Sequence, residues 1–138
     1  MTLRSIDLLS STVRLGRDGT VHVAKDAPGP DQDGWRLAAF HAKSGTDVRT
    51  DHWEVCPESD KLVSCLIGMI RLCLRPEPGA AEEEVRLTAG TAAVVPRGRW
   101  HRIKLDVPST IITVALPRGT LLEERTEGAS PVLFSAGT

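Results

Sequence analysis

The chain has 138 residues, a formal net charge of −1, 41% hydrophobic residues and 25% charged residues. This length fits one globular domain, 1–138, that buries roughly two thirds of the surface of its unfolded chain. Acidic and basic residues nearly balance, which argues against a dedicated nucleic-acid binder, because such proteins need an excess of Lys and Arg. No apolar run approaches the roughly 20 residues of a membrane helix, so we expect no membrane partner.

Two features of the chain indicate a cytoplasmic protein. Arg4 and Asp7 interrupt the apolar run at the N-terminus, so we expect no signal peptide. The chain has an odd number of cysteines, and all three lie in largely apolar surroundings: Cys56, Cys65 and Cys73. Without an export signal they are expected to be reduced thiols.

Short apolar runs with period-two alternation, separated by Gly, Pro and Asp, dominate the chain and predict strands. In chain order the expected strands are 20–24, 35–43, 49–56, 61–67, 69–75, 83–87, 92–95, 101–106 and 110–116. The segment 6–15 is ambiguous, 121–125 is expected to form a turn or two of helix, and 132–134 an edge strand. This succession of short strands, without alternating helices, predicts an all-β sandwich or barrel.

One motif covers the residues before the strand expected at 101–106 and ends at the first residue of that strand. Residues 90–101 read GTAAVVPRGRWH, in which a glycine, a Pro-x-Gly turn and a histidine recur at fixed spacing. Pro96 and Gly98 favour a tight bend, and His101 then begins a strand with its imidazole facing inward. This segment resembles the second signature motif of the cupin family.

A second segment strengthens that resemblance. Residues 52–68 read HWEVCPESDKLVSCLIG, which is similar to the first cupin motif of small bacterial members. The resemblance spans about 35–116 and implies a cupin-type double-stranded β-helix, an antiparallel jelly-roll barrel with little helix. The remaining residues are then N- and C-terminal extensions of a single cupin-like domain. Because members of the family often dimerise, the resemblance also implies a homodimer.

The family's metal site is not retained as a set. In the family, the first motif supplies two histidines and a glutamate, and the second supplies a third histidine, around a divalent metal. Here Glu54, Cys56 and Lys61 stand at the first three positions, and only His101 matches. A lysine ammonium among the ligands would repel a dication, which disfavours a bound metal.

The same residues still predict a pocket. Strand alternation places His52, Glu54 and Cys56 on one face, and the resemblance directs that face, with Lys61 and His101, into the barrel. The walls of this pocket are expected to include His41, Val63 and Ile103. A barrel of this size can hold one small molecule.

Three functions remain open for this pocket. In the first, His101 and Glu54 transfer protons and Lys61 stabilises an anionic oxygen, as in a metabolite isomerase, cyclase or lyase. In the second, His52, Cys56 and His101 bind Zn or Fe in a metal-dependent enzyme. In the third, the domain is a non-enzymatic sensory or accessory module. The sequence does not identify the substrate or the reaction.

Overall fold

The computed structural model describes residues 3–24 and 34–125. Apart from two short 3-10 helices, its regular structure is all strand. The elements in chain order are η1 (Leu8–Ser10), β1 (Thr12–Leu15), β2 (Val21–Ala24), β3 (Trp35–Ala42), η2 (Gly45–Val48), β4 (His52–Val55), β5 (Lys61–Ile67), β6 (Met69–Leu74), β7 (Glu83–Thr88), β8 (Thr91–Val95), β9 (His101–Leu105), β10 (Ser109–Ala115) and β11 (Leu121–Glu124). No helix in the described ranges has the length and apolar character needed to cross a membrane.

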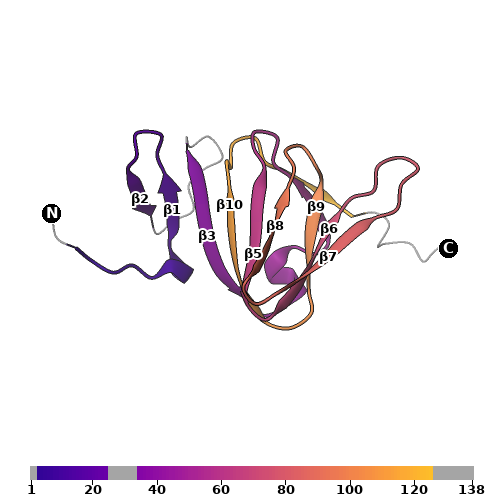
Figure 1. The fold of residues 1–138 in the computed structure, drawn as a ribbon, viewed down its shortest axis with the longest axis horizontal. Helices are drawn as coiled ribbons and strands as arrows, with labels where there is room; N and C mark the ends of the chain where they lie inside the picture. The colour runs from indigo at the N-terminus through magenta and orange to yellow at the C-terminus, as the bar shows by residue number, and fades with distance from the viewer. Residues whose placement is uncertain (1–2, 25–33, 126–138) are drawn as a thin grey trace.

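The strands form two sheets that face each other (Figure 1). One sheet has six strands in the order β2-β1-β3-β10-β5-β8, and the other has five in the order β11-β4-β9-β6-β7. All of the strand pairs are antiparallel. The predicted antiparallel, all-β jelly-roll architecture is confirmed. The β1–β2 hairpin extends the six-stranded sheet beyond the segment 35–116 that carries the resemblance.

Two expectations for local structure need correction, and one ambiguous segment is resolved. The segment 121–125 is not helical, because Leu121–Glu124 forms β11 and pairs with the edge of β4. The segment 6–15 divides into η1 and β1. The strand expected from residue 49 begins only at His52, because Arg49 ends η2 in the left-handed region at φ 51°. The expected edge strand at 132–134 lies outside the described residues.

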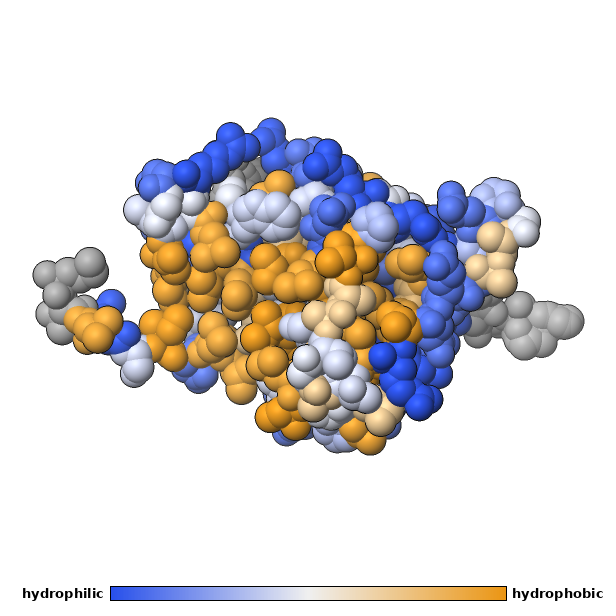
Figure 2. All heavy atoms as spheres, in the orientation of Figure 1, coloured by the Kyte–Doolittle hydropathy of each residue, from blue (hydrophilic) through white to orange (hydrophobic). Residues whose placement is uncertain are grey.

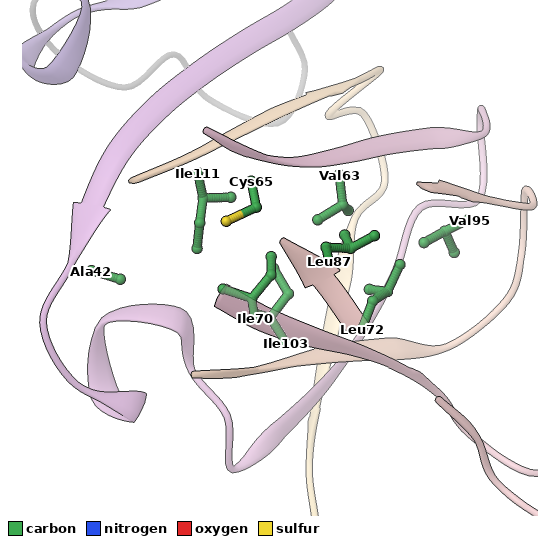
Figure 3. Close-up of a cluster of buried hydrophobic side chains, with 9 residues drawn as sticks. All are labelled: Ala42, Val63, Cys65, Ile70, Leu72, Leu87, Val95, Ile103 and Ile111. Carbon is green, nitrogen blue, oxygen red and sulfur yellow. The ribbon is translucent and has the colours of Figure 1, made fainter. Parts of the chain in front are cut away.

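The hydrophobic core lies between the sheets and draws on both. Its buried members are Ala42, Val63, Cys65, Ile70, Leu72, Leu87, Val95, Ile103 and Ile111, and Figure 3 shows their side chains pointing toward one another. Because alternate residues of a strand point to the same face, each core strand carries a second inward residue further along.

These inward positions become polar toward one end of the barrel. Along β5 the sequence of inward residues runs from Cys65 through Val63 to Lys61, and along β10 from Ile111 to Thr113. The apolar end packs as a core. The polar end is where the candidate site lies.

Candidate functional site

An ion pair joins the two sheets at the centre of the site. Lys61 begins β5 of the six-stranded sheet and Glu54 lies in β4 of the five-stranded sheet, with Lys61 Nζ 3.0 Å from Glu54 Oε2. The Lys61 side chain is 9% exposed and that of Glu54 is 29% exposed. Burial alone would raise the pKa of Glu54, but the charge and hydrogen bond of Lys61 outweigh it and lower that pKa. Glu54 is therefore a carboxylate at neutral pH.

His101 lies beside this pair, directly opposite Glu54 in the register of β4 and β9. It is buried, and its Nδ1 lies 3.1 Å from the carbonyl oxygen of Arg99. Because a carbonyl can only accept, Nδ1 carries the hydrogen, and Nε2 of the neutral ring is left with its lone pair. Among the described residues, Nε2 has no hydrogen-bond partner.

The environment of His101 keeps the imidazole neutral. Burial is the main cause that lowers its pKa to about 4, and the positive charge of Lys61 acts in the same direction. At pH 7 His101 is therefore an uncharged, buried hydrogen-bond acceptor. Such an unsatisfied polar atom is costly in a stable fold and calls for a ligand, a water or a catalytic role.

A cavity of about 420 Å³ opens on the Glu54–Lys61 pair. Both sheets and η2 contribute to its wall. The lining residues are Arg36, Ala38, Phe40, Asp47, Val48, Arg49, Glu54, Lys61, Ile103, Thr113, Thr120 and Leu122. This volume is within the range of small-molecule sites, which is about 300–1,000 Å³.

Two smaller hollows share Glu54 and Lys61 with the cavity. One, of about 20 Å³, is lined by His52 and His101 among others, and the second, of about 30 Å³, is lined by Cys56. The predicted residues His52, Glu54, Cys56, Lys61 and His101 therefore surround adjoining spaces, with the ion pair between the histidines and the cysteine. A hollow of about 20 Å³ has room for one water or one ligand group.

His52 and Cys56 occupy the margins of this arrangement. His52 Nδ1 lies 2.9 Å from Asp51 Oδ1, and the His52 side chain is 32% exposed. Cys56 is buried, and its Sγ accepts a long hydrogen bond from the Thr120 hydroxyl at 4.0 Å. Burial raises the pKa of the Cys56 thiol, so it is not an activated nucleophile at neutral pH.

The structure corrects two of the predicted wall residues and keeps a third. His41 is exposed on β3, where its Nδ1 lies 3.0 Å from Thr110 Oγ1. Alternation directs its neighbours Phe40 and Ala42 inward, so His41 lies on the outer face. Val63 belongs to the packed core and does not line the cavity. Ile103 does line it.

Sequence reasoning missed the two arginines of the cavity wall. Arg36 lies on β3 with Ala38 and Phe40, so strand alternation within 35–43 contained the necessary signal. Arg49 follows η2, and its left-handed conformation was not expected because that conformation is uncommon outside glycine.

The donor set around the ion pair does not fit the metal centre that the resemblance implies. A buried ammonium contacts the only carboxylate at the family's ligand positions, and it would repel a dication at that point. The structure also does not bring His52, Cys56 and His101 together as ligands. In residues 3–24 and 34–125, the only three such side chains whose ligand atoms lie within 4.8 Å of one another are Cys73, Glu82 and Glu84.

That second group is part of an ion-pair network on the outer face of the five-stranded sheet. Lys104 Nζ lies 3.1 Å from Glu84 Oε1 and 3.9 Å from Glu82 Oε2. The Cys73 thiol lies 3.5 Å from Glu84 Oε1, and burial raises its pKa to about 11. The carboxylates already have cationic partners and the thiol keeps its proton, so the group is not built to hold a cation.

Solved structures resemble this fold at low sequence identity. Peruvianin-I, a cysteine peptidase from Thevetia peruviana latex, aligns over 67% of this chain and 58% of its own, with 16% identity and a TM-score of 0.54. An oxalate oxidase aligns over 63% of this chain and 45% of its own, with 14% identity and a TM-score of 0.51. An oxalate decarboxylase from Bacillus subtilis aligns over 65% and 23%, with 14% identity and a TM-score of 0.50.

These comparisons bear on the fold alone. The chain spans less than half of the oxalate oxidase and about a quarter of the oxalate decarboxylase. No family model matches the sequence, and no curated protein does. Together with the two facing antiparallel sheets, the structural likeness shows that the chain shares the two-sheet jelly-roll fold of these solved structures.

Proposed function

We propose that this protein binds a small molecule in its cavity and transfers a proton on it, as a metabolite isomerase, cyclase or lyase that needs no metal. The observation that carries the proposal is the buried, unpartnered Nε2 of His101 beside the Glu54–Lys61 pair. A base and a cation that line the same hollow form the arrangement required for removing a proton next to a carbonyl group.

The reaction proceeds in two balanced steps. His101 Nε2 accepts a proton from a C–H bond of the ligand, and the electron pair of that bond moves onto the adjacent carbonyl oxygen. Lys61 stabilises the resulting oxyanion, while Glu54 holds the ammonium in position. The imidazolium then returns the proton to a different atom of the ligand, or to a leaving group, and neutral His101 is regenerated.

The low pKa of His101 is compatible with this role. It belongs to the pocket without a ligand, where burial and Lys61 both disfavour the imidazolium. A negative charge that develops on the ligand lies near both groups and raises the pKa of His101. The base thus gains proton affinity as the oxyanion forms.

Deuterium exchange tests the proposal. The full chain is incubated in D2O with pyruvate, acetoacetate and dihydroxyacetone, and NMR follows solvent deuterium entering C–H positions beside the carbonyl. We expect exchange on at least one probe. His101→Asn keeps a donor to the Arg99 carbonyl and removes the base, whereas His101→Gln places an amide acceptor where Nε2 was.

Both variants should lose exchange if the proposal is right, because neither amide can take a proton from carbon. His41→Asn is the matched control, because His41 is a histidine outside the cavity, and it should behave like the unmodified protein. Exchange that persists in both His101 variants, or that no probe undergoes, contradicts the proposal.

We also propose that the chain forms a homodimer through the outer face of its six-stranded sheet. A row of directly paired apolar residues crosses all six strands on that face. In order from β2 to β8 it consists of Val23, Val13, Leu37, Val114, Leu62 and Val94. Figure 2 shows the apolar surface that covers this side of the molecule.

A second copy is the occupant that this face fits best. Val94 is 60% exposed, Val23 is 45% exposed and Leu62 is 38% exposed. With neighbouring strands about 4.8 Å apart, six strands span roughly 25 Å, which is wide enough for an interface of about 800 Å² per partner. A face whose paired row carries no charge can pack against the same face of a second copy across a twofold axis, and it offers no charge pattern that would select a different partner.

We propose further that the protein works in the reducing environment of the cytoplasm. Cys56, Cys65 and Cys73 are all buried and free of disulfides. Free buried cysteines are usual in proteins of reducing compartments.

A further inference from the structure

We propose that the cavity selects a small organic anion, a carboxylate or a phosphate, and that Arg36 and Arg49 are its recognition groups. This inference rests on the proposed function, since it names the class of ligand that the cavity takes. Neither arginine belongs to the motifs that resemble the cupin family.

The balance of charge in the cavity wall is the first step. The wall carries five charged side chains, namely Arg36, Asp47, Arg49, Glu54 and Lys61. Glu54 and Lys61 neutralise each other at 3.0 Å. Asp47 Oδ2 accepts the backbone N–H groups of Lys43 at 2.8 Å and Ser44 at 3.3 Å.

Both acids of the wall therefore have hydrogen-bond or ion-pair partners, whereas Arg49 acts on Glu54 only through its charge, which lowers the pKa of that carboxyl. Within residues 3–24 and 34–125, the guanidinium groups of Arg36 and Arg49 make no hydrogen bond or ion pair. Other arginines on the same barrel, such as Arg71, Arg75 and Arg102, each meet a carboxylate. The cavity is thus left with an unbalanced positive charge.

The positions of the two arginines are the second step. Arg36 also lines the small hollow at Cys56, and Arg49 also lines the one at His101. Because both hollows share the Glu54–Lys61 pair, each arginine lines a space that this pair also lines. An anionic group held by either one lies beside the Glu54–Lys61 pair, which also lines the hollow of the proposed base.

The chemistry of the guanidinium group sets the class of ligand. A planar fork of N–H donors matches the two oxygens of a carboxylate or the oxygens of a phosphate. The apolar part of the wall, which includes Phe40, Val48 and Leu122, fits a short carbon chain. The mixture favours a small metabolite with an anionic end over a neutral sugar or a purely apolar ligand.

Calorimetric titration at constant ionic strength tests this inference with matched probes. The carboxylate arm uses malonate, succinate and pyruvate, the phosphate arm uses inorganic phosphate, and the neutral arm uses malonamide, succinamide and pyruvamide. We expect binding of at least one anion and at least tenfold weaker binding of its amide. Whether the carboxylates or phosphate bind more tightly identifies the type of anion.

The variants Arg36→Gln and Arg49→Gln should each weaken anion binding at least tenfold. Arg86→Gln removes the same charge from an exposed position on β7 and should change binding less than twofold. Equal binding of acids and amides, equal effects of all three variants, or no binding of any anion overturns the inference. If amides bind and undergo exchange that depends on His101, the proposed function stands and the inference about anion recognition fails. If no probe of either kind binds or exchanges, both fail.

Discussion

Lys61 Nζ lies 3.0 Å from Glu54 Oε2, although the two residues belong to different sheets. Both occupy positions at which the resembled cupin motif places metal ligands. An ammonium and a carboxylate thus form, within the barrel, the cross-sheet connection that the resemblance assigns to a metal. This relationship explains why the fold can keep a polar cavity without the family's donor set.

The ion pair makes the stability of the fold depend on both partners together. Lys61→Met leaves Glu54 partly buried without its cation, and Glu54→Leu leaves a buried ammonium. Breaking a fully buried pair costs about 3–5 kcal/mol, and the 29% exposure of Glu54 reduces the expected loss for either single variant to about 2–3 kcal/mol. Lys61→Met combined with Glu54→Leu should recover most of it. Urea unfolding of the unmodified protein, the two single variants and the double variant measures the coupling energy between positions 54 and 61. Losses that simply add in the double variant would contradict this prediction.

A bound metal is the alternative that the sequence left open, and elemental analysis decides it. Because the donor set does not fit a dication, protein purified without chelator or acid should contain Zn and Fe far below one equivalent. Its thermal midpoint should also stay constant in EDTA. A full equivalent of either metal, lost together with deuterium exchange in His101→Asn, would show that the histidine is a ligand and not a free base.

Gly68 permits the tight connection between β5 and β6. It has φ +98°, and a Cβ there would meet the Ser109 side chain and would lie 2.7 Å from the carbonyl oxygen of Pro108. Ser109 cannot easily move, because its hydroxyl bonds the Val107 carbonyl at 2.7 Å and accepts the Met69 N–H at 3.1 Å. Gly68→Ala should therefore cost about 3 kcal/mol or more.

Gly90 provides the matched control for this prediction. It has φ +87° but no heavy atom within 4 Å of an added Cβ. Gly90→Ala should cost only about 1–2 kcal/mol, from the left-handed backbone alone. Denaturant unfolding of both variants separates the steric part from the conformational part, and equal losses would remove the steric argument.

The proposed dimer predicts a sharp response to one charge on the apolar row. Leu62→Glu buries an unpaired carboxylate in the interface and should convert the dimer to a monomer in sedimentation or light scattering. Leu121→Glu makes the same change at a 58% exposed leucine of the other sheet and should leave the dimer intact. A monomeric unmodified protein at micromolar concentration would refute the dimer directly.

The sequence was informative where a local pattern decides the structure. Alternation and Pro-Gly turns located β3, β5 and β9 to within a residue of their ends, because these strands have one buried face. It failed at Leu121–Glu124, which is strand only because it pairs with the open edge of β4. Pairing between segments distant in the chain leaves no local trace.

The candidate site follows the same division. His101, Glu54 and Lys61 could be placed near one another from motif spacing and alternation. Their actual relationship depends on how the two sheets pack, and so does the separation of Cys56 from the two histidines by the ion pair. Arg49 enters the wall only because η2 ends in a left-handed residue. That geometry has no clear signature in the sequence.

The pH dependence of stability reports the state of His101 separately from the carboxylates. Its pKa falls from 6.5 to about 4 on folding, mainly by burial, so between these values the unfolded chain binds a proton that the folded chain does not. Stability is unaffected by His101 above pH 6.5 and decreases as the pH falls, by about 3 kcal/mol at pH 4. Glu54 and the other carboxylates with lowered pKa values add their own losses mainly below about pH 4.5.

Urea unfolding measures this dependence. The free energy of unfolding of the unmodified protein should decrease as the pH falls from 6.5 to 5. His101→Gln should reduce the slope of that decrease, whereas His41→Asn should leave the contribution of His101 in place. A slope unchanged in His101→Gln would mean that the ring takes up a proton as readily in the folded chain as in the unfolded one.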